Sequence, residues 1–123
     1  MKPLVETLFR NSLKSICPRT LIESSLKNYP KTGQVHVIGF GKAAAGMVSG
    51  VVNTFGDHAV NSGIVSVPIG TYESMSENNR LDLWPTHERI KIFEVAKNNL
   101  PDEFSVRASQ EILDFCTKLG QGN

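Results

Sequence analysis

The stretch QVHVIGFGKAAAGMVSGVV, from Gln34 to Val52, limits the fold of this chain more than any other. It opens with a run of β-branched residues around Val37 that stops at Gly39. Beyond Lys42, apolar residues recur at intervals of three and four, the spacing that one face of an α-helix requires. These residues are Ala44, Met47, Val48, Val51, Val52 and Phe55. The stretch therefore predicts a strand, a glycine turn and an amphipathic helix.

The rest of the chain repeats this alternation. Gly56 stands where a helix end favours glycine, and GIVSVPIG then predicts a second strand. Residues 71–88 are polar and without period, so we expect an irregular loop anchored by Trp84 and Pro85, followed by a third strand in RIKIFEVA. The final segment, NNLPDEFSVRASQEILDFCTKLGQGN, opens with cap-forming residues and predicts a helix that ends near Gly120.

Strands that alternate with helices predict an α/β fold, a Rossmann-like and mostly parallel sheet with helices on both faces. We find no repeat or linker, so residues 1–123 are expected to form one domain. Only about three strands are predicted, fewer than such sheets usually have, and the sequence stops directly after a helix. We therefore expect the fold to be incomplete.

The first twenty residues, MKPLVETLFRNSLKSICPRT, predict a helix. Apolar residues lie at helical spacing, as in an ordinary packed helix. They are Leu4, Leu8, Phe9, Leu13 and Ile16. The basic residues among them also suit a mitochondrial presequence, and this alternative stays open. Pro18 should break the helix, and Thr20 should cap a short second one.

Charge and cysteine content exclude several classes of protein. Lys and Arg number 13 and Asp and Glu 12, so a net charge of +1 offers no field for nucleic acid or an acidic membrane. The longest apolar run, residues 43–52, is too short to span a bilayer. Cys17 and Cys116 lie far apart without a zinc-binding pattern, and we expect them to pack as small apolar groups in a reduced, cytoplasmic setting.

The glycine turn is the candidate ligand site. In α/β sheets, ligands collect beyond the carboxyl ends of the strands. Gly39 and Gly41 would let the backbone approach a ligand, the helix start would attract an anion, and Lys42 would add a positive charge. The simpler interpretation, that the glycines only allow tight packing and Lys42 is solvated, stays open.

This turn shares features with two phosphate-binding motifs. Gly39 to Ala44 fits the dinucleotide fingerprint G-x-G-x-x-A, but the second strand ends in Val67-Pro68 without the acidic residue that would hold the ribose. The P-loop pattern fails because Ala43 stands where Ser or Thr should hold magnesium.

Four segments, in order, resemble the amino-terminal part of the glycerate kinase family whose carboxyl-terminal domain is called MOFRL. They are LFRNSLKSICPRTLIESSL, VHVIGFGKAAAGM, GIVSVPIG and NLPDEFSVRASQEIL. Residues 71–88 match poorly. Many microbial members have Ala-Gly-His-Pro where this chain has residues 96–99, Ala-Lys-Asn-Asn, and this difference resembles the animal branch.

This resemblance implies a glycerate 2-kinase, which phosphorylates D-glycerate to 2-phosphoglycerate with ATP and Mg²⁺. It implies Lys42 as the catalytic residue, in contact with the glycerate carboxylate or the transferred phosphoryl group, and Gly39 and Gly41 as shaping the turn. Asp102 would contact substrate or metal, or only cap the last helix, which we favour. No metal ligand is assigned.

The family continues into a second domain that lies outside this sequence, so we expect the 123-residue chain to be inactive alone. Its partners would be D-glycerate, ATP and the missing carboxyl-terminal part of the same protein. The alternative function is a non-catalytic nucleotide- or dinucleotide-binding module that uses the same turn.

Overall fold

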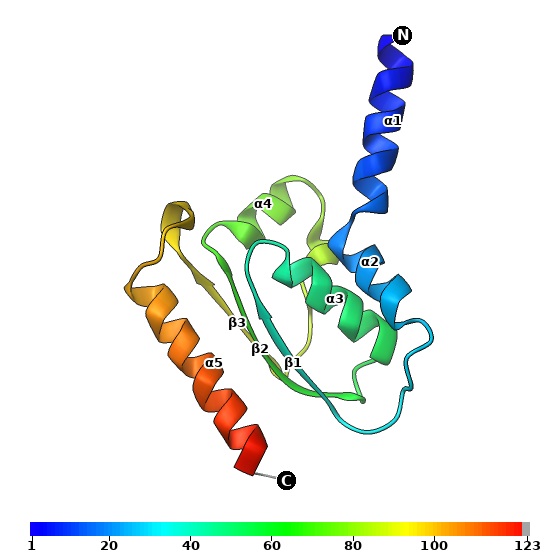
Figure 1. The fold of residues 1–123 in the computed structure, drawn as a ribbon. Helices are drawn as coiled ribbons and strands as arrows, with labels where there is room; N and C mark the ends of the chain where they lie inside the picture. Colours follow the sequence, from blue (N-terminus) through cyan, green and yellow to red (C-terminus); the bar gives the residue numbers. More distant parts are fainter. Residues whose placement is uncertain (122–123) are drawn as a thin grey trace.

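Three parallel strands form the sheet of this protein (Figure 1). Its computed structural model describes residues 1–121, and at position 99 it describes only the backbone. The strands are β1 (Val35–Phe40), β2 (Val60–Pro68) and β3 (Ile90–Val95). They lie in the order β1-β2-β3, with Val37 opposite Gly63 and Gly63 opposite Ile90. The last two residues of the predicted domain, 122–123, lie outside the described part.

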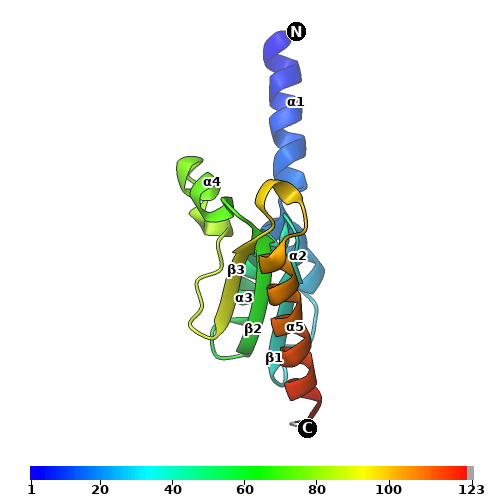
Figure 2. The ribbon, with the colours of Figure 1, turned by 90° about the vertical axis from the view of Figure 1, so that its left-hand side faces the viewer.

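Helices cover both faces of this sheet. The described helices are α1 (Lys2–Ser15), α2 (Pro18–Leu26), α3 (Ala44–Phe55), α4 (Thr71–Glu77) and α5 (Glu103–Gln121), with short 3-10 turns at η1 (Leu81–Leu83) and η2 (Lys97–Asn99). Helix α3 packs on one face and α2 lies over α3, whereas α5 packs on the opposite face against β2 and β3 (Figure 2). The predicted α/β class, with parallel strands and helices on both faces, is confirmed.

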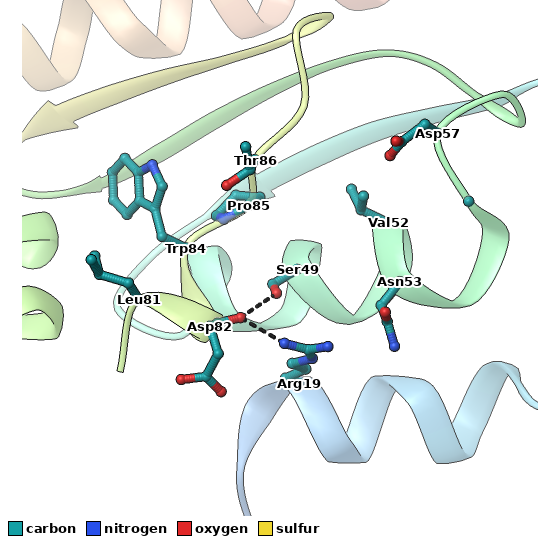
Figure 3. A pocket seen from close by; sticks show the side chains of 11 residues that line it. Arg19, Ser49, Val52, Asn53, Asp57, Leu81, Asp82, Trp84, Pro85 and Thr86 are labelled. Carbon is teal, nitrogen blue, oxygen red and sulfur yellow. Dashed lines mark hydrogen bonds between the residues drawn. The ribbon is translucent and has the colours of Figure 1, made fainter. Parts of the chain in front are cut away.

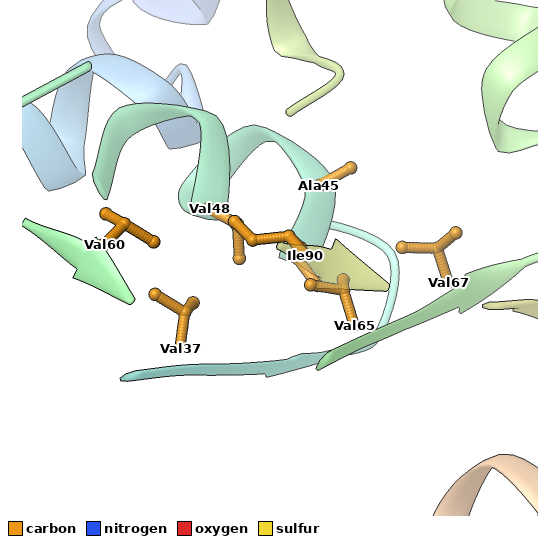
Figure 4. Packing of buried hydrophobic residues seen from close by; sticks show 8 residues of the cluster. Val37, Ala45, Val48, Val60, Val65, Val67 and Ile90 are labelled. Atoms are coloured by element: carbon orange, nitrogen blue, oxygen red, sulfur yellow. The ribbon is translucent and has the colours of Figure 1, made fainter. Parts of the chain in front are cut away.

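The core lies between α3 and the sheet. It is built from small and β-branched side chains, and Figure 4 shows how they meet. Its buried members are Val37, Ala44, Ala45, Val48, Val60, Val65, Val67 and Ile90. Burying one valine side chain stabilises a fold by about 1.5 to 3 kcal/mol, so this layer supplies much of the driving force.

Close contact between α2 and α3 depends on Gly50. A Cβ at position 50 would lie 2.7 Å from the Arg19 carbonyl oxygen and 3.1 Å from Ile22 Cβ. Real Cβ atoms do not approach a carbonyl oxygen so closely, so glycine lets the two helices pack at this distance. The ends of α3 agree with the sequence too, since Gly56 closes the helix with a φ of 83°.

Residues 71–88, predicted to be one irregular loop, begin instead with α4 and the turn η1. The prediction missed them because this segment has no apolar period, and tertiary contacts select its structure. The predicted anchor is confirmed: Trp84 packs against the core cluster, and its ring meets that of Tyr72 edge to face at 5.1 Å.

Helix α1 forms as predicted, but the prediction that it packs is wrong for the described chain. The helix has no buried residue, and its apolar side chains are about half to two-thirds exposed. It projects away from the sheet (Figure 1), because no described segment lies against its apolar face.

Two smaller predictions are also corrected. Thr20 does not cap α2, because the helix already begins at Pro18, with Cys17 in the capping position. Proline suits the first helical turn because it lacks an amide that would need a partner. Cys116 is exposed on α5, outside the face that meets the sheet, whereas Cys17 is half-buried. Both cysteines are free.

Candidate functional site

The glycine turn lies at the carboxyl end of β1, as the sequence predicted. Close packing favours glycine at position 39, because a Cβ there would lie 3.1 Å from Val48 Cγ2 and 3.4 Å from Val65 Cγ1. Gly41 has a φ of 100°, which L side chains rarely adopt, and its amide donates to the Ser66 carbonyl at 3.0 Å. The two glycines thus do different things: Gly39 allows close packing, and Gly41 makes the turn.

Only part of the turn is open to a ligand. Gly41, Lys42 and Ala43 are exposed, but the first helical residues, Ala44 and Ala45, are buried. An anion would therefore meet the turn itself and the Lys42 ammonium. Lys42 forms no ion pair within the described residues, so its charge is available for a ligand.

Two pockets flank the end of β2, and both include Pro68. One, of about 340 Å³, is lined by Lys42 together with Gly70, Thr71 and Ser74. The other, of about 330 Å³, is lined by Gly41, the ends of β2 and β3, and the start of α5. The carboxyl edge of the sheet thus presents one pocket with a lysine and one with Gly41 and the residues Ser66, Ser105 and Ser109.

Asp102 is held as a helix cap. Its Oδ1 accepts hydrogen bonds from the Ser105 amide and hydroxyl, both at 2.8 Å, and its Oδ2 accepts one from the Lys97 amide at 3.2 Å. These donors, the Ser105 amide first, hold the pKa of Asp102 below its usual value. The capping interpretation is confirmed, and the carboxylate lines neither pocket at the strand ends.

A third pocket, of about 410 Å³, was not predicted (Figure 3). It lies between α2, α3 and the segment that follows α4. The Asp82 carbonyl accepts from Ser49 Oγ at 2.7 Å and from Arg19 Nη1 at 2.9 Å, and Arg19 also pairs with Glu23 at 2.7 Å. Because Arg19 pairs with Glu23 and Asp82 with Arg80, we interpret this pocket as structural. No period in residues 71–88 could have pointed to it.

A free thiol, that of Cys17, also lies beside this segment. Burial raises the pKa of the Cys17 thiol, but hydrogen bonds from Thr20 and from Arg80 outweigh that effect and lower it overall. The Arg80 Nη2 lies 3.8 Å from Cys17 Sγ. This thiol is far from the glycine turn in sequence and shares no pocket with it.

Neither a metal cluster nor a bilayer-spanning helix is found in residues 1–121. No three His, Cys, Asp or Glu side chains gather there in a way that could hold an ion. Every helix in the same range is too short or too polar to cross a membrane.

Comparisons with known proteins give one family and one kind of relative. A family described as a domain of unknown function, DUF4147, matches residues 4–123. Glycerate kinase from Bos taurus is 32% identical over 119 residues, which cover 85% of this chain and 23% of the relative. Glycerate kinase from Homo sapiens is 29% identical over 119 residues, which cover 85% of this chain and 23% of the relative. Glycerate kinase from Danio rerio is 33% identical over 94 residues, which cover 76% of this chain and 18% of the relative. No solved structure matches. The chain thus spans about a quarter of the length of these relatives.

Proposed function

The chain belongs to the DUF4147 family, and from this premise we propose that it is the amino-terminal part of a glycerate kinase. The relatives confirm the resemblance to glycerate kinases over most of this chain. The proposed reaction is transfer of the γ-phosphoryl group of ATP to the 2-hydroxyl of D-glycerate. A bond forms between that oxygen and the γ-phosphorus, the bond from the γ-phosphorus to the β–γ bridging oxygen breaks with ADP as the leaving group, and the hydroxyl proton is released to water. The proposal includes a cytoplasmic protein, with mitochondria as the alternative.

The observation that carries this proposal is the exposed Lys42, which forms no ion pair within residues 1–121 and lies beside a pocket at the carboxyl end of the sheet. Phosphoryl transfer needs positioned positive charge, since negative charge spreads over the transferred group and substrate oxygens. A lysine ammonium can supply that charge to the glycerate carboxylate or to the phosphoryl group. We assign Lys42 this catalytic role.

The other predicted residues act on the position of Lys42 and of the substrate. Gly39 lets α3 pack closely on β1, and Gly41 turns the chain so that Lys42 points outward from the core. Asp102 fixes the start of α5, which lines the pocket next to Gly41. We therefore assign Asp102 a positioning role and not contact with substrate.

Magnesium, which the family implies, is assigned no ligand among the described residues. They contain no cluster of three potential ligands, and the Asp102 carboxylate already accepts backbone amides. The proposal therefore assigns no step of the reaction to a metal held by residues 1–121. These residues position the substrate and supply charge through Lys42.

The test is Lys42→Ala in the complete product of this gene. We expect kcat/KM for ATP-dependent glycerate phosphorylation to fall by about 10²- to 10³-fold, the usual effect of removing one group that stabilises the transition state. Lys14→Ala is the matched control, because Lys14 is an exposed lysine on α1, outside the pockets at the strand ends. Unchanged turnover in a folded Lys42→Ala variant would remove Lys42 from the mechanism.

A second function, a non-catalytic dinucleotide-binding module, rests on the G-x-G-x-x-A spacing of Gly39 to Ala44 at a strand-to-helix turn. Calorimetry with NAD separates the two functions. Micromolar binding of NAD without glycerate, together with absent kinase turnover in the complete protein, would favour the module.

A further inference from the structure

β1 is an outer strand with one unpaired edge. The sheet order places β2 on one side of it and no described strand on the other. The Val35 and Gly41 amides donate to the Ala59 and Ser66 carbonyls, so every second residue of β1 faces β2. The amides of His36, Ile38 and Phe40 consequently point to the open side. Such an edge is a ready template for another strand.

A groove with both polar and apolar lining follows this edge. A pocket of about 480 Å³ is lined by residues 35–38 in succession and by Leu26, Tyr29, Val51 and Phe55. Successive residues of a strand point to opposite faces of the sheet. A pocket that contacts all four of these residues must therefore lie along the edge of the strand. On the sheet face that carries α5, Ile38 and Phe40 remain 40% and 77% exposed. The edge thus offers both hydrogen bonds and apolar surface.

The position of α5 indicates which segment fills this edge. Helix α3 lies on one face and connects β1 to β2. The connection on that face therefore moves across the sheet in the direction that leads from β1 through β2 to β3. Helix α5 lies on the opposite face (Figure 2). About 98% of parallel crossovers are right-handed, and a right-handed crossover through the opposite face must step the other way, from β3 back toward β1.

The course of α5 agrees with that direction. It starts beyond the carboxyl end of β3, packs on β2 and β3, and runs back toward the amino ends of the strands (Figures 1 and 2). In Figure 2 its end lies on the side of β1. Since β2 already has two neighbours, the first unoccupied place in this direction is the outer edge of β1.

We propose that the free edge of β1 is the docking site of the chain segment that follows α5, which adds there as a fourth parallel strand. The relatives, of which this chain spans about a quarter, are long enough to supply such a segment. The strand order would reverse between β1 and the new strand, and ligand crevices in α/β sheets form at such reversals. The crevice would open beside Gly41 and Lys42. Only this last consequence rests on the proposed function.

Hydrogen exchange tests the proposal directly. The transcript is first sequenced past the codon for Asn123, and amide exchange is then compared between the 123-residue chain and the complete product. We expect exchange at His36, Ile38 and Phe40 to slow at least about 100-fold in the complete product. A frame that stops at Asn123, unchanged exchange, or protection in the short chain that rises with its concentration would each overturn the proposal, the last in favour of a second copy.

Proline substitutions give an independent measurement. Ile38→Pro removes an amide that faces the open edge, which an outer strand tolerates and an inner strand does not. Ile92→Pro is the matched control at the outer edge of β3. The Arg89 and Val95 carbonyls accept from β2, so the amide of position 92 faces away from β2.

We expect Ile38→Pro to lower Tm more in the complete product than in the short chain. Ile92→Pro should lower Tm by the same amount in both. Equal losses for Ile38→Pro would overturn the proposal. Neither readout is turnover, so failure of the kinase proposal would leave both unchanged.

Discussion

At the scale of single residues, Asp102 links local structure to pH. The amides that it caps stabilise the ionised carboxylate, which lowers its pKa in the folded chain below the ordinary value of 3.8. A carboxyl group with a lowered folded pKa stabilises the fold fully above its unfolded pKa, and this contribution is lost as pH falls through the folded pKa. The effect therefore belongs to the range from about pH 4 downward.

Asp102→Asn should flatten this part of the stability profile. Asparagine also caps helices but does not ionise in this range. We expect the wild-type chain to lose more Tm than the variant between pH 5 and pH 2, measured by circular dichroism. The hydrogen bond from Arg80 also lowers the pKa of Asp82. Asp82 is present in both chains, so its effect on Tm cancels when the two profiles are compared. Parallel profiles would show that the Asp102 carboxylate contributes nothing to stability through its charge.

Gly50 tests whether close helix packing, and not helix propensity, decides stability. Alanine normally favours a helix by up to about 1 kcal/mol over glycine. At position 50 its Cβ would lie 2.7 Å from the Arg19 carbonyl, so α2 must shift. We expect Gly50→Ala to lower the free energy of unfolding by about 1 to 3 kcal/mol, as overpacking does.

Gly120 provides the control for this substitution. It also lies in a helix, α5, but an added Cβ would meet nothing within 4 Å. Urea unfolding of Gly120→Ala should show unchanged or slightly higher stability, by up to about 1 kcal/mol. If Gly50→Ala behaved like Gly120→Ala, the close contact between α2 and α3 would not be a constraint.

At the scale of elements, α1 should be dispensable for the stability of this chain. It contributes no buried side chain, and single substitutions at exposed positions usually change the free energy of unfolding by no more than about 0.5 kcal/mol. Deletion of residues 1–16 should therefore shift Tm by no more than about 4 °C. Val65→Ala is the contrasting control: Val65 is fully buried, and we expect a loss of about 1.5 to 3 kcal/mol. A deletion as costly as Val65→Ala would restore the packed helix that the sequence predicted.

The elements also show where sequence reasoning succeeds. The unit β1-turn-α3 was predictable because its apolar period, its glycines and its burial all agree, and Gly39 and Lys42 followed from the position of the turn. The packing of α1 was not predictable. An apolar stripe indicates that one face of a helix will be covered, but it does not indicate which segment covers that face. Helix α4 and the Arg19 to Asp82 contact were missed because they depend on tertiary contacts and not on a period.

At the scale of the whole molecule, the proposed function makes the carboxyl edge of the sheet one part of a larger site. It contributes Lys42 and two open pockets, whereas phosphoryl transfer distributes charge over several phosphate oxygens and needs several groups to hold them. The chain also spans only about a quarter of the relatives. The expected outcome is that residues 1–123 position part of the substrate without turning it over.

We therefore predict that the purified 123-residue chain does not phosphorylate D-glycerate above the rate of a blank that contains ATP and Mg²⁺. Formation of 2-phosphoglycerate is followed by ³¹P NMR at high chain concentration, with circular dichroism to confirm that the chain is folded. Lys42→Ala serves as the control for a contaminating kinase, because a contaminant would be unaffected by it. Turnover that scales with chain concentration and disappears in Lys42→Ala would contradict the prediction, and would mean that the turn and its pockets suffice for the chemistry without a further strand or domain.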